Sequence, residues 1–330
     1  MPVKVLPILR PVSYSESNMA KKTPDARDYI KPLNMNGLQG RMLHMPAAKP
    51  GGREILVVYG HHSTLERWWG LVQNFNTYGA VTMPDLPGFG GMDSFYRIGQ
   101  KPTIDNLADY LAAFVKLRYK RRRIVIAGIS VGFVIATRML QRYPDLAKKV
   151  DLIVCAAGFA HHDDFKFSKI RMFMYRFISK VVSWPVVSTF YRLVLLHPWV
   201  LRKAYAKTHN AKHKFAEAAA LPEKFEAMMD VEIMLWHKND VRTHFLTANE
   251  FLHLDNCKKR VAAPVWNVYT INDQYFDQSV VEQHLKVIFE DYTATPADMK
   301  QHVVSVLADK KETAPFIPPK LRKYMARKPA

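Results

Sequence analysis

The stretch Arg121–Phe133, RRRIVIAGISVGF, decides the fold class of this chain. Residues Arg123–Ala127 form a short apolar run, which is typical of a strand buried on both faces of a parallel sheet. The run leads into GISVG, in which Ser130 stands between Gly128 and Gly132, and a helical pattern follows at once. A Gly-x-Ser-x-Gly motif between a buried strand and a helix predicts a sharp turn that exposes the serine hydroxyl above the sheet. The alternative is a small residue that a tight turn requires.

The same alternation of strand and helix continues on both sides of this stretch. Further strands are expected at Leu38–Ala47, Glu54–Gly60, Ala80–Met83, Val150–Gly158, Pro264–Asp273 and His302–Ala308. Amphipathic helices are expected between them, one capped by Thr103 and another begun by a capping box of Ser279 with Glu282. Strands that alternate with helices predict an α/β fold with a mostly parallel sheet flanked by helices.

The alternation stops between about His161 and Lys258, where only helical patterns occur. The predicted organisation is therefore an irregular basic segment over residues 1–35, an α/β core over 36–160 and 259–330, and a helical insertion over 161–258.

The net charge is unusually high, because 48 Lys and Arg face 29 Asp and Glu, which gives +19. Such a charge suits an anionic membrane surface, nucleic acid or acidic ligands. Nucleic acid is not expected as a partner, because no nucleic-acid-binding motif accompanies the basic runs. The oligomeric state stays open.

The first residues lack the unbroken apolar run of a signal peptide, and two cysteines do not make a disulfide scaffold, so a cytoplasmic location is expected. The most apolar window, Val181–Leu201, is interrupted by Pro185, Arg192, His197 and Pro198. It predicts two buried or interfacial helices rather than a membrane span.

Four motifs together resemble those of the α/β-hydrolase superfamily: GISVGF (128–133), YGHHSTLERWW (59–69), DLPGFGGMDS (85–94) and YTINDQYFD (269–277). The resemblance covers roughly residues 38–160 and 260–325. It implies the α/β-hydrolase fold, with the insertion in the place of a helical cap, and no cofactor.

The resemblance also implies site residues. Ser130 corresponds to the nucleophile and Asp273 to the acid of a catalytic triad. The backbone N–H groups of His61 and Val131 would form the oxyanion hole. Tyr59 departs from the family, in which a histidine usually stands at this position.

The general base is the part that the sequence does not supply where the family has it. After the expected last strand stand Asp309, Lys310 and Lys311, and His302 would lie at the start of that strand, far from Ser130. Three alternatives remain open. The base is one of His61, His62, His161 and His162; or it is Lys310; or the protein is a catalytically degenerate binding protein.

The histidine pairs GHHS and AHHDD lack the spacing of a metal site, so no metal is predicted. The insertion is rich in aromatic residues and Met, which suits a small apolar or acyl substrate. It is also basic, so contact with an anionic membrane is a further alternative. The favoured function is a serine hydrolase, similar to an esterase, that acts on ester, thioester or similar acyl bonds.

Overall fold

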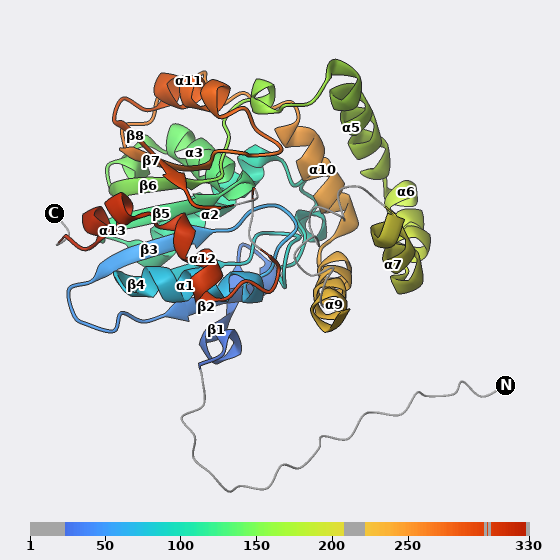
Figure 1. Cartoon of the computed structure of the whole chain (residues 1–330), viewed down its shortest axis with the longest axis horizontal. Helices are drawn as coiled ribbons and strands as arrows, with labels where there is room; N and C mark the ends of the chain where they lie inside the picture. The colour runs from blue at the N-terminus through green and yellow to red at the C-terminus, as the bar shows by residue number, and fades with distance from the viewer. Residues whose placement is uncertain (1–23, 208–221, 300–301, 303–304, 328–330) are drawn as a thin grey trace, which may run out of the picture.

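A computed structural model describes residues 24–207, 222–299, 302 and 305–327 of the chain, and Figure 1 shows its arrangement. Its centre is an eight-stranded sheet in the order β1-β2-β4-β3-β5-β6-β7-β8. Strands β3 to β8 run parallel to one another, and β2 pairs antiparallel with both β1 and β4. The α/β fold with a mostly parallel sheet is confirmed. The strands are β1 (Ile30–Met35), β2 (Leu38–Met45), β3 (Arg53–Val58), β4 (Gly79–Pro84), β5 (Ile124–Ile129), β6 (Val150–Ala156), β7 (Val265–Thr270) and β8 (Tyr292–Ala297).

The core strands form because their apolar runs are buried on both faces. Every residue of β5 is buried, and β3 and β6 each have one half-buried position. Helix α3 lies against β3, β5 and β6 and packs on α2, whereas α1 lies against β4 and packs on α12. The helices of this core are α1 (Trp69–Asn76), α2 (Ile104–Tyr119), α3 (Val131–Arg142), α4 (Pro144–Ala147), α11 (Gln278–Ile288), α12 (Lys310–Thr313) and α13 (Pro319–Met325).

Of the two helix caps predicted from the sequence, one is confirmed and the other is wrong. Thr103 caps α2 as expected, because its side chain accepts a hydrogen bond from the N–H of Asn106. The capping box predicted at Ser279 is wrong: Asp277 is the N-cap of α11, and its side chain accepts from the N–H groups of Ser279 and Val280. An ionised carboxylate at this place also faces the positive end of the helix dipole.

The chain between β6 and β7 contains helices and no named strand in its described residues (Figure 1). Its helices gather beside the sheet, with α10 nearest to the core and α5 to α7 outermost. These inserted helices are α5 (Lys169–Val182), α6 (Pro185–Phe190), α7 (Pro198–Lys207), α9 (Pro222–Lys238) and α10 (Val241–Phe251), with a π-helical turn over Tyr191–Leu195. Within the described residues, no helix has both the length and the apolarity that crossing a membrane requires.

Both ends of the chain differ from the expectation. The irregular segment predicted over residues 1–35 already contains a 3-10 helix at Ala26–Tyr29 and strand β1, while residues 1–23 lie outside the described part. The last strand is not His302–Ala308 but β8, whose mixed sequence YTATPA belongs to the edge of the sheet. An edge strand buries less of its surface and tolerates Pro, so its sequence lacks a continuous apolar run. His302 therefore follows the last strand instead of starting it.

Candidate active site

Ser130 lies on a sharp turn between β5 and α3. Its backbone has φ 50° and ψ −119°, a conformation that non-glycine residues rarely adopt. Its N–H donates to the carbonyl of Ala156 at the end of the neighbouring strand. A side-chain carbon at Gly132 would lie 2.1 Å from Val58 O, and one at Gly128 would lie 2.5 Å from Phe133 Cα. Only glycine fits at these two positions, so the motif maintains the strained turn.

The loop after β3 lies against Ser130. A side-chain carbon at Gly60 would be 3.3 Å from Ser130 Cβ, so the backbone approaches the serine closely. The N–H groups of His61 and Val131 have no acceptor among the described residues. Two unoccupied backbone donors beside a serine are the arrangement that stabilises a developing oxyanion.

Tyr59 replaces the usual histidine and holds this loop in shape. Its hydroxyl donates to Asp85 Oδ1 at 2.9 Å and accepts from the N–H of Leu86 at 2.8 Å. Asp85 is fully buried and pairs with Arg41 at 2.9 Å. Burial raises the pKa of Asp85 to about 6, and Arg41 opposes this rise. Tyr59 thus links the end of β3 to the loop that follows β4.

Asp273 follows β7 and is almost completely buried. Its Oδ1 accepts from the N–H groups of Tyr275 at 2.8 Å and Phe276 at 3.1 Å, so the turn holds the carboxylate in one orientation. Its Oδ2 accepts from His302 Nδ1 at 2.6 Å. The charge-assisted bond to an imidazole is the contact expected of an acid that orients a base.

His302 lies elsewhere than predicted from the sequence. It follows β8, is 5% exposed, and its ring packs edge-on against Tyr275 and Phe276 with both pairs of ring centres 5.1 Å apart. Because β5, β7 and β8 are parallel, the segments after them meet at the same edge of the sheet, so His302 shares the edge that carries Ser130. The prediction that His302 lies far from Ser130 is wrong, since it rested on a strand at His302–Ala308, and the described residues of that segment form none. The Ser130 hydroxyl makes no hydrogen bond among the described residues.

Of the four histidines proposed as the base, His61 and His62 are engaged with the inserted helices. His61 Nε2 bonds to the carbonyl oxygen of His244 on α10 at 3.0 Å, and burial lowers the pKa of His61 to about 4. His62 has φ 56°, its ring lies tilted against that of Trp236 of α9 with the ring centres 4.2 Å apart, and it approaches Glu232 at 3.9 Å. These contacts join the loop after β3 to the insertion.

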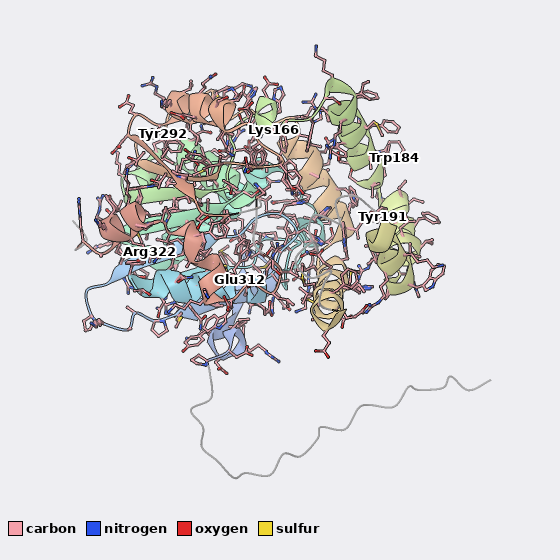
Figure 2. All side chains as sticks on the ribbon, in the orientation of Figure 1. Lys166, Trp184, Tyr191, Tyr292, Glu312 and Arg322 are labelled. Atoms are coloured by element: carbon pink, nitrogen blue, oxygen red, sulfur yellow. The ribbon has the colours of Figure 1, made fainter. Side chains whose placement is uncertain are left out.

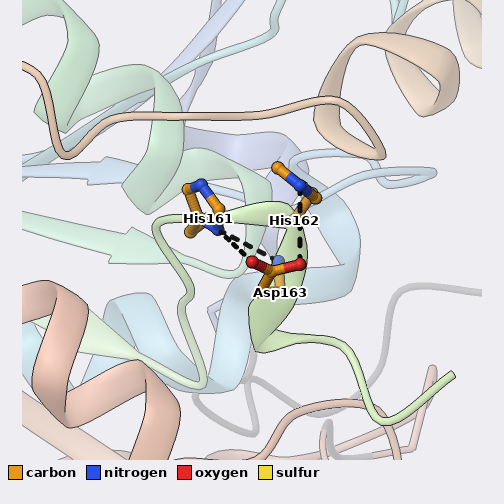
Figure 3. A group of neighbouring side chains, drawn as sticks. All are labelled: His161, His162 and Asp163. Carbon is orange, nitrogen blue, oxygen red and sulfur yellow. Dashed lines mark hydrogen bonds and ion pairs between the residues drawn. The ribbon is translucent and has the colours of Figure 1, made fainter.

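The other two histidines, His161 and His162, form a group with Asp163 (Figure 3). One nitrogen or oxygen of each residue lies within 4.8 Å of the others, and the residue types are those of a metal site. However, His161 Nδ1 accepts from the N–H of Asp163, and His162 Nδ1 bonds to the carbonyl of Leu254. The hydrogen bonds therefore explain the group as the start of a short 3-10 helix at His162–Asp164, and the absence of a metal stays a prediction.

The alternative base Lys310 is exposed and starts α12, which Asp309 caps. Its carbonyl accepts from Asn74 of α1 at 2.6 Å. The position has the contacts of a surface helix terminus rather than those of a buried lysine.

Aromatic rings surround the Asp273–His302 pair. Phe276, which packs on His302, also stacks on Phe159 with ring centres 4.6 Å apart. Phe159 in turn contacts Phe165 and Phe251, and Phe251 contacts His61. A chain of apolar rings thus connects the Asp273–His302 pair to the loop after β3.

The insertion is fixed to the glycine-rich loop after β4. Asp240 donates its N–H to Gly88 O at 2.9 Å, and Gly90 donates its N–H to Asn239 Oδ1 at 2.8 Å. Gly88 has φ 83°, and a side-chain carbon there would be 2.5 Å from Thr243. The beginning of α10 is thereby held beside the candidate site.

This fold, with a strained serine turn and an acid–imidazole pair at one sheet edge, defines an α/β-hydrolase. Residues 52–291 match the family model described as serine aminopeptidase, S33, and the chain belongs to this family of α/β-hydrolase enzymes. A curated relative from Gibberella zeae, an AB hydrolase superfamily protein, is 29% identical over 98 residues. That match covers 29% of this chain and only 33% of the relative.

Solved structures share the fold over most of their length. An esterase from Exiguobacterium antarcticum has a TM-score of 0.61 at 13% identity and covers 88% of this chain and 97% of its own. MenH from S. aureus has a TM-score of 0.61 at 10% identity, over 87% and 99%. A putative lipase from Acinetobacter baumannii has a TM-score of 0.58 at 14% identity, over 91% of each chain. At these identities the likeness shows the fold alone.

Proposed function

We propose that the protein is a serine hydrolase of acyl bonds with Ser130 as nucleophile, His302 as general base and Asp273 as the residue that orients the base. The observation that carries this proposal is the 2.6 Å bond between Asp273 Oδ2 and His302 Nδ1, at the sheet edge that also carries the Ser130 turn. A bond at Nδ1 leaves Nε2 as the proton acceptor of a neutral imidazole.

The reaction proceeds in two acyl transfers. Ser130 Oγ attacks the carbonyl carbon while its proton passes to His302 Nε2, and the N–H groups of His61 and Val131 stabilise the oxyanion. His302 then protonates the leaving alcohol or thiol, and the acyl group stays on Ser130. Water attacks the acyl-enzyme and gives its proton to His302, which passes it to Ser130 Oγ as the acyl–Oγ bond breaks and the acid leaves. Asp273 stabilises the imidazolium in both halves without taking its proton. The Ser130 hydroxyl makes no hydrogen bond among the described residues. This is compatible with the proposed reaction, because catalytic hydrogen bonds often tighten only when substrate is bound.

The rings around the acid–base pair support an apolar acyl group as the substrate part that binds there. Phe276 and Tyr275 contact His302 itself, and Phe251 contacts the loop of the oxyanion donors. An ester or thioester fits this setting better than a peptide with charged ends, which would leave its charges unpaired beside apolar rings. The similar structures of an esterase and a putative lipase are in line with this class.

A fluorophosphonate probe tests the activated serine directly. We expect the intact chain to be labelled and to hydrolyse a short-chain p-nitrophenyl ester, and the Ser130→Ala variant to lose both. The matched control is Ser279→Ala, since Ser279 is exposed on α11 and its hydroxyl donates to Asp277 Oδ1.

An intact, folded chain that takes up no probe and cleaves no acyl ester would refute the hydrolase. It would instead support a binding protein that has kept the strained turn without proton transfer.

A further inference from the structure

The outer layer of the insertion exposes a large apolar surface that the proposed reaction does not use. Sixteen large apolar side chains are exposed among the described residues, and twelve of them lie in residues 170–199; the other four are Leu117, Ile271, Val287 and Leu307. Val186 is 82% exposed, Leu193 71% and Phe173 69%. Apolar side chains gathered in this way mark a site of interaction rather than ordinary surface. We call this surface the apolar cap face. It comprises residues 170–199, from α5 through α6 and the π-helical turn to Trp199 in the first turn of α7.

The surface is formed by one side of amphipathic helices. On α5 the inner side buries Ser179 and Val182 and packs against α10, while Phe173 and Phe177 stack on each other one turn apart at the outer side. Trp184 stands between α5 and α6, on the part of the insertion farthest from the sheet (Figure 2). The inner side already explains how the helices are held, so the outer side has no role in the packing of the described residues.

The charge of the same segment identifies the kind of partner. Residues 165–207 contain nine Lys or Arg and no Asp or Glu. Lys169, Lys180 and Arg192 are exposed and have no acidic partner among the described residues. Lys203 lies 3.8 Å over the ring of Trp199, so a cation and an apolar ring share one place at the edge of the face.

We infer that the apolar cap face docks on a lipid bilayer with anionic headgroups. Exposed aromatic and aliphatic side chains would enter the boundary between headgroups and acyl chains, and the surrounding cations would meet the anionic headgroups. Trp184 and Trp199 suit this boundary because indole rings are enriched there. The helices would lie on the membrane, since none of the described helices can cross it.

Vesicle sedimentation of the full-length protein tests this inference. The probe is a set of vesicles of phosphatidylcholine alone or with roughly one quarter phosphatidylglycerol. We expect binding to the anionic vesicles only, and the bound fraction should fall as the salt rises from about 0.1 M to about 0.5 M. The double variant Trp184→Ser/Trp199→Ser should lower the partition coefficient about tenfold or more.

Two controls make the result specific. Leu117 on α2 lies outside the face and is about as exposed as the two Trp side chains. The Leu117→Ser variant should therefore bind vesicles like the parent chain. Lys180→Glu/Arg192→Glu should weaken binding to anionic vesicles. All of these side chains are exposed, so unchanged melting temperatures are expected and will verify that the variants fold.

Equal binding to neutral and anionic vesicles, or no effect of the two Trp substitutions, would overturn the inference. So would a dimer in sedimentation velocity that the Trp substitutions dissociate, because the face would then belong to a second copy. The test does not depend on Ser130, so its failure is distinct from failure of the hydrolase.

Discussion

Ser130 shows how a single residue is held in an unfavourable backbone conformation. The positive φ is maintained because α3 begins in direct contact with the end of β3, and Gly132 is the point of that contact. A side chain there would meet two backbone carbonyls, of Val58 and Tyr59, which cannot rotate away. The glycine of the motif is therefore required by packing.

The substitution Gly132→Ala should lower the free energy of unfolding by roughly 1–3 kcal/mol or more, because the added methyl group overpacks a rigid site. It should also lower the rate of fluorophosphonate labelling, since α3 and the Ser130 turn must shift together. Chemical denaturation measures the first effect and a labelling time course the second.

The control for this prediction is Gly99→Ala. Gly99 has φ 71° but open space around the added carbon, so only backbone strain of about 1–2 kcal/mol is expected, without an effect on labelling. If the two substitutions proved equally mild, close packing at Gly132 would not be what fixes the turn.

At the scale of elements, the insertion and the loop after β3 meet at buried imidazoles. His61 of the loop and His244 of α10 have ring centres 4.1 Å apart, and His62, Trp236 and Glu232 complete the group. Burial, followed by the nearby His61 and His62, lowers the pKa of His244 well below its usual range. Burial lowers the pKa of His61 as well, to about 4, so the fold favours the neutral form of both rings.

This predicts that stability falls as the pH is lowered from about 6.5 toward 4. Below about pH 6.5 the unfolded chain binds protons at these histidines that the folded protein does not accept, so protonation favours unfolding. For His61, with a folded pKa of about 4, the loss is roughly 3 kcal/mol. Denaturation at a series of pH values measures it.

The matched variant is His244→Asn, which should show a shallower dependence on pH in the same window. Other groups that titrate in the same pH range, such as Asp85, are present in both chains, so their contributions to the pH dependence cancel in the difference. An unchanged slope would mean that His244 is not held neutral by the fold.

Strands and helices with a regular pattern of apolar residues could be predicted from the sequence, whereas the strand at the edge of the sheet, β8, could not. The apolar runs of β3, β5, β6 and β7 and the stripe of α2 are visible because burial on defined faces selects apolar residues at fixed spacing. Strand β8 is an edge strand with Thr293, Thr295 and Pro296, so it lacks such a run. The apolar residues between His302 and Ala308 resemble such a run, but the last strand lies before them.

For the whole molecule, the position of the last strand decides whether His302 can be recognised as a candidate base. Ser130, Asp273 and His302 follow three different strands, β5, β7 and β8, and the strand order brings them to one edge. The serine motif and the acid could be inferred locally, from a turn signature and from the end of a buried strand. The histidine depends on where the sheet ends, which is a property of the complete fold.

Comparing the candidate bases by mutation tests the central claim most directly. The measurement is kcat for a short-chain p-nitrophenyl ester in His302→Gln, with His161→Gln and His162→Gln as matched controls. Removing the general base should lower kcat by roughly 10³-fold or more, whereas the two controls, whose rings belong to the helix start at His162–Asp164, should retain the activity of the parent chain. Full activity in a folded His302→Gln chain, or its loss in either control alone, would contradict the assignment of His302 as the partner of Ser130.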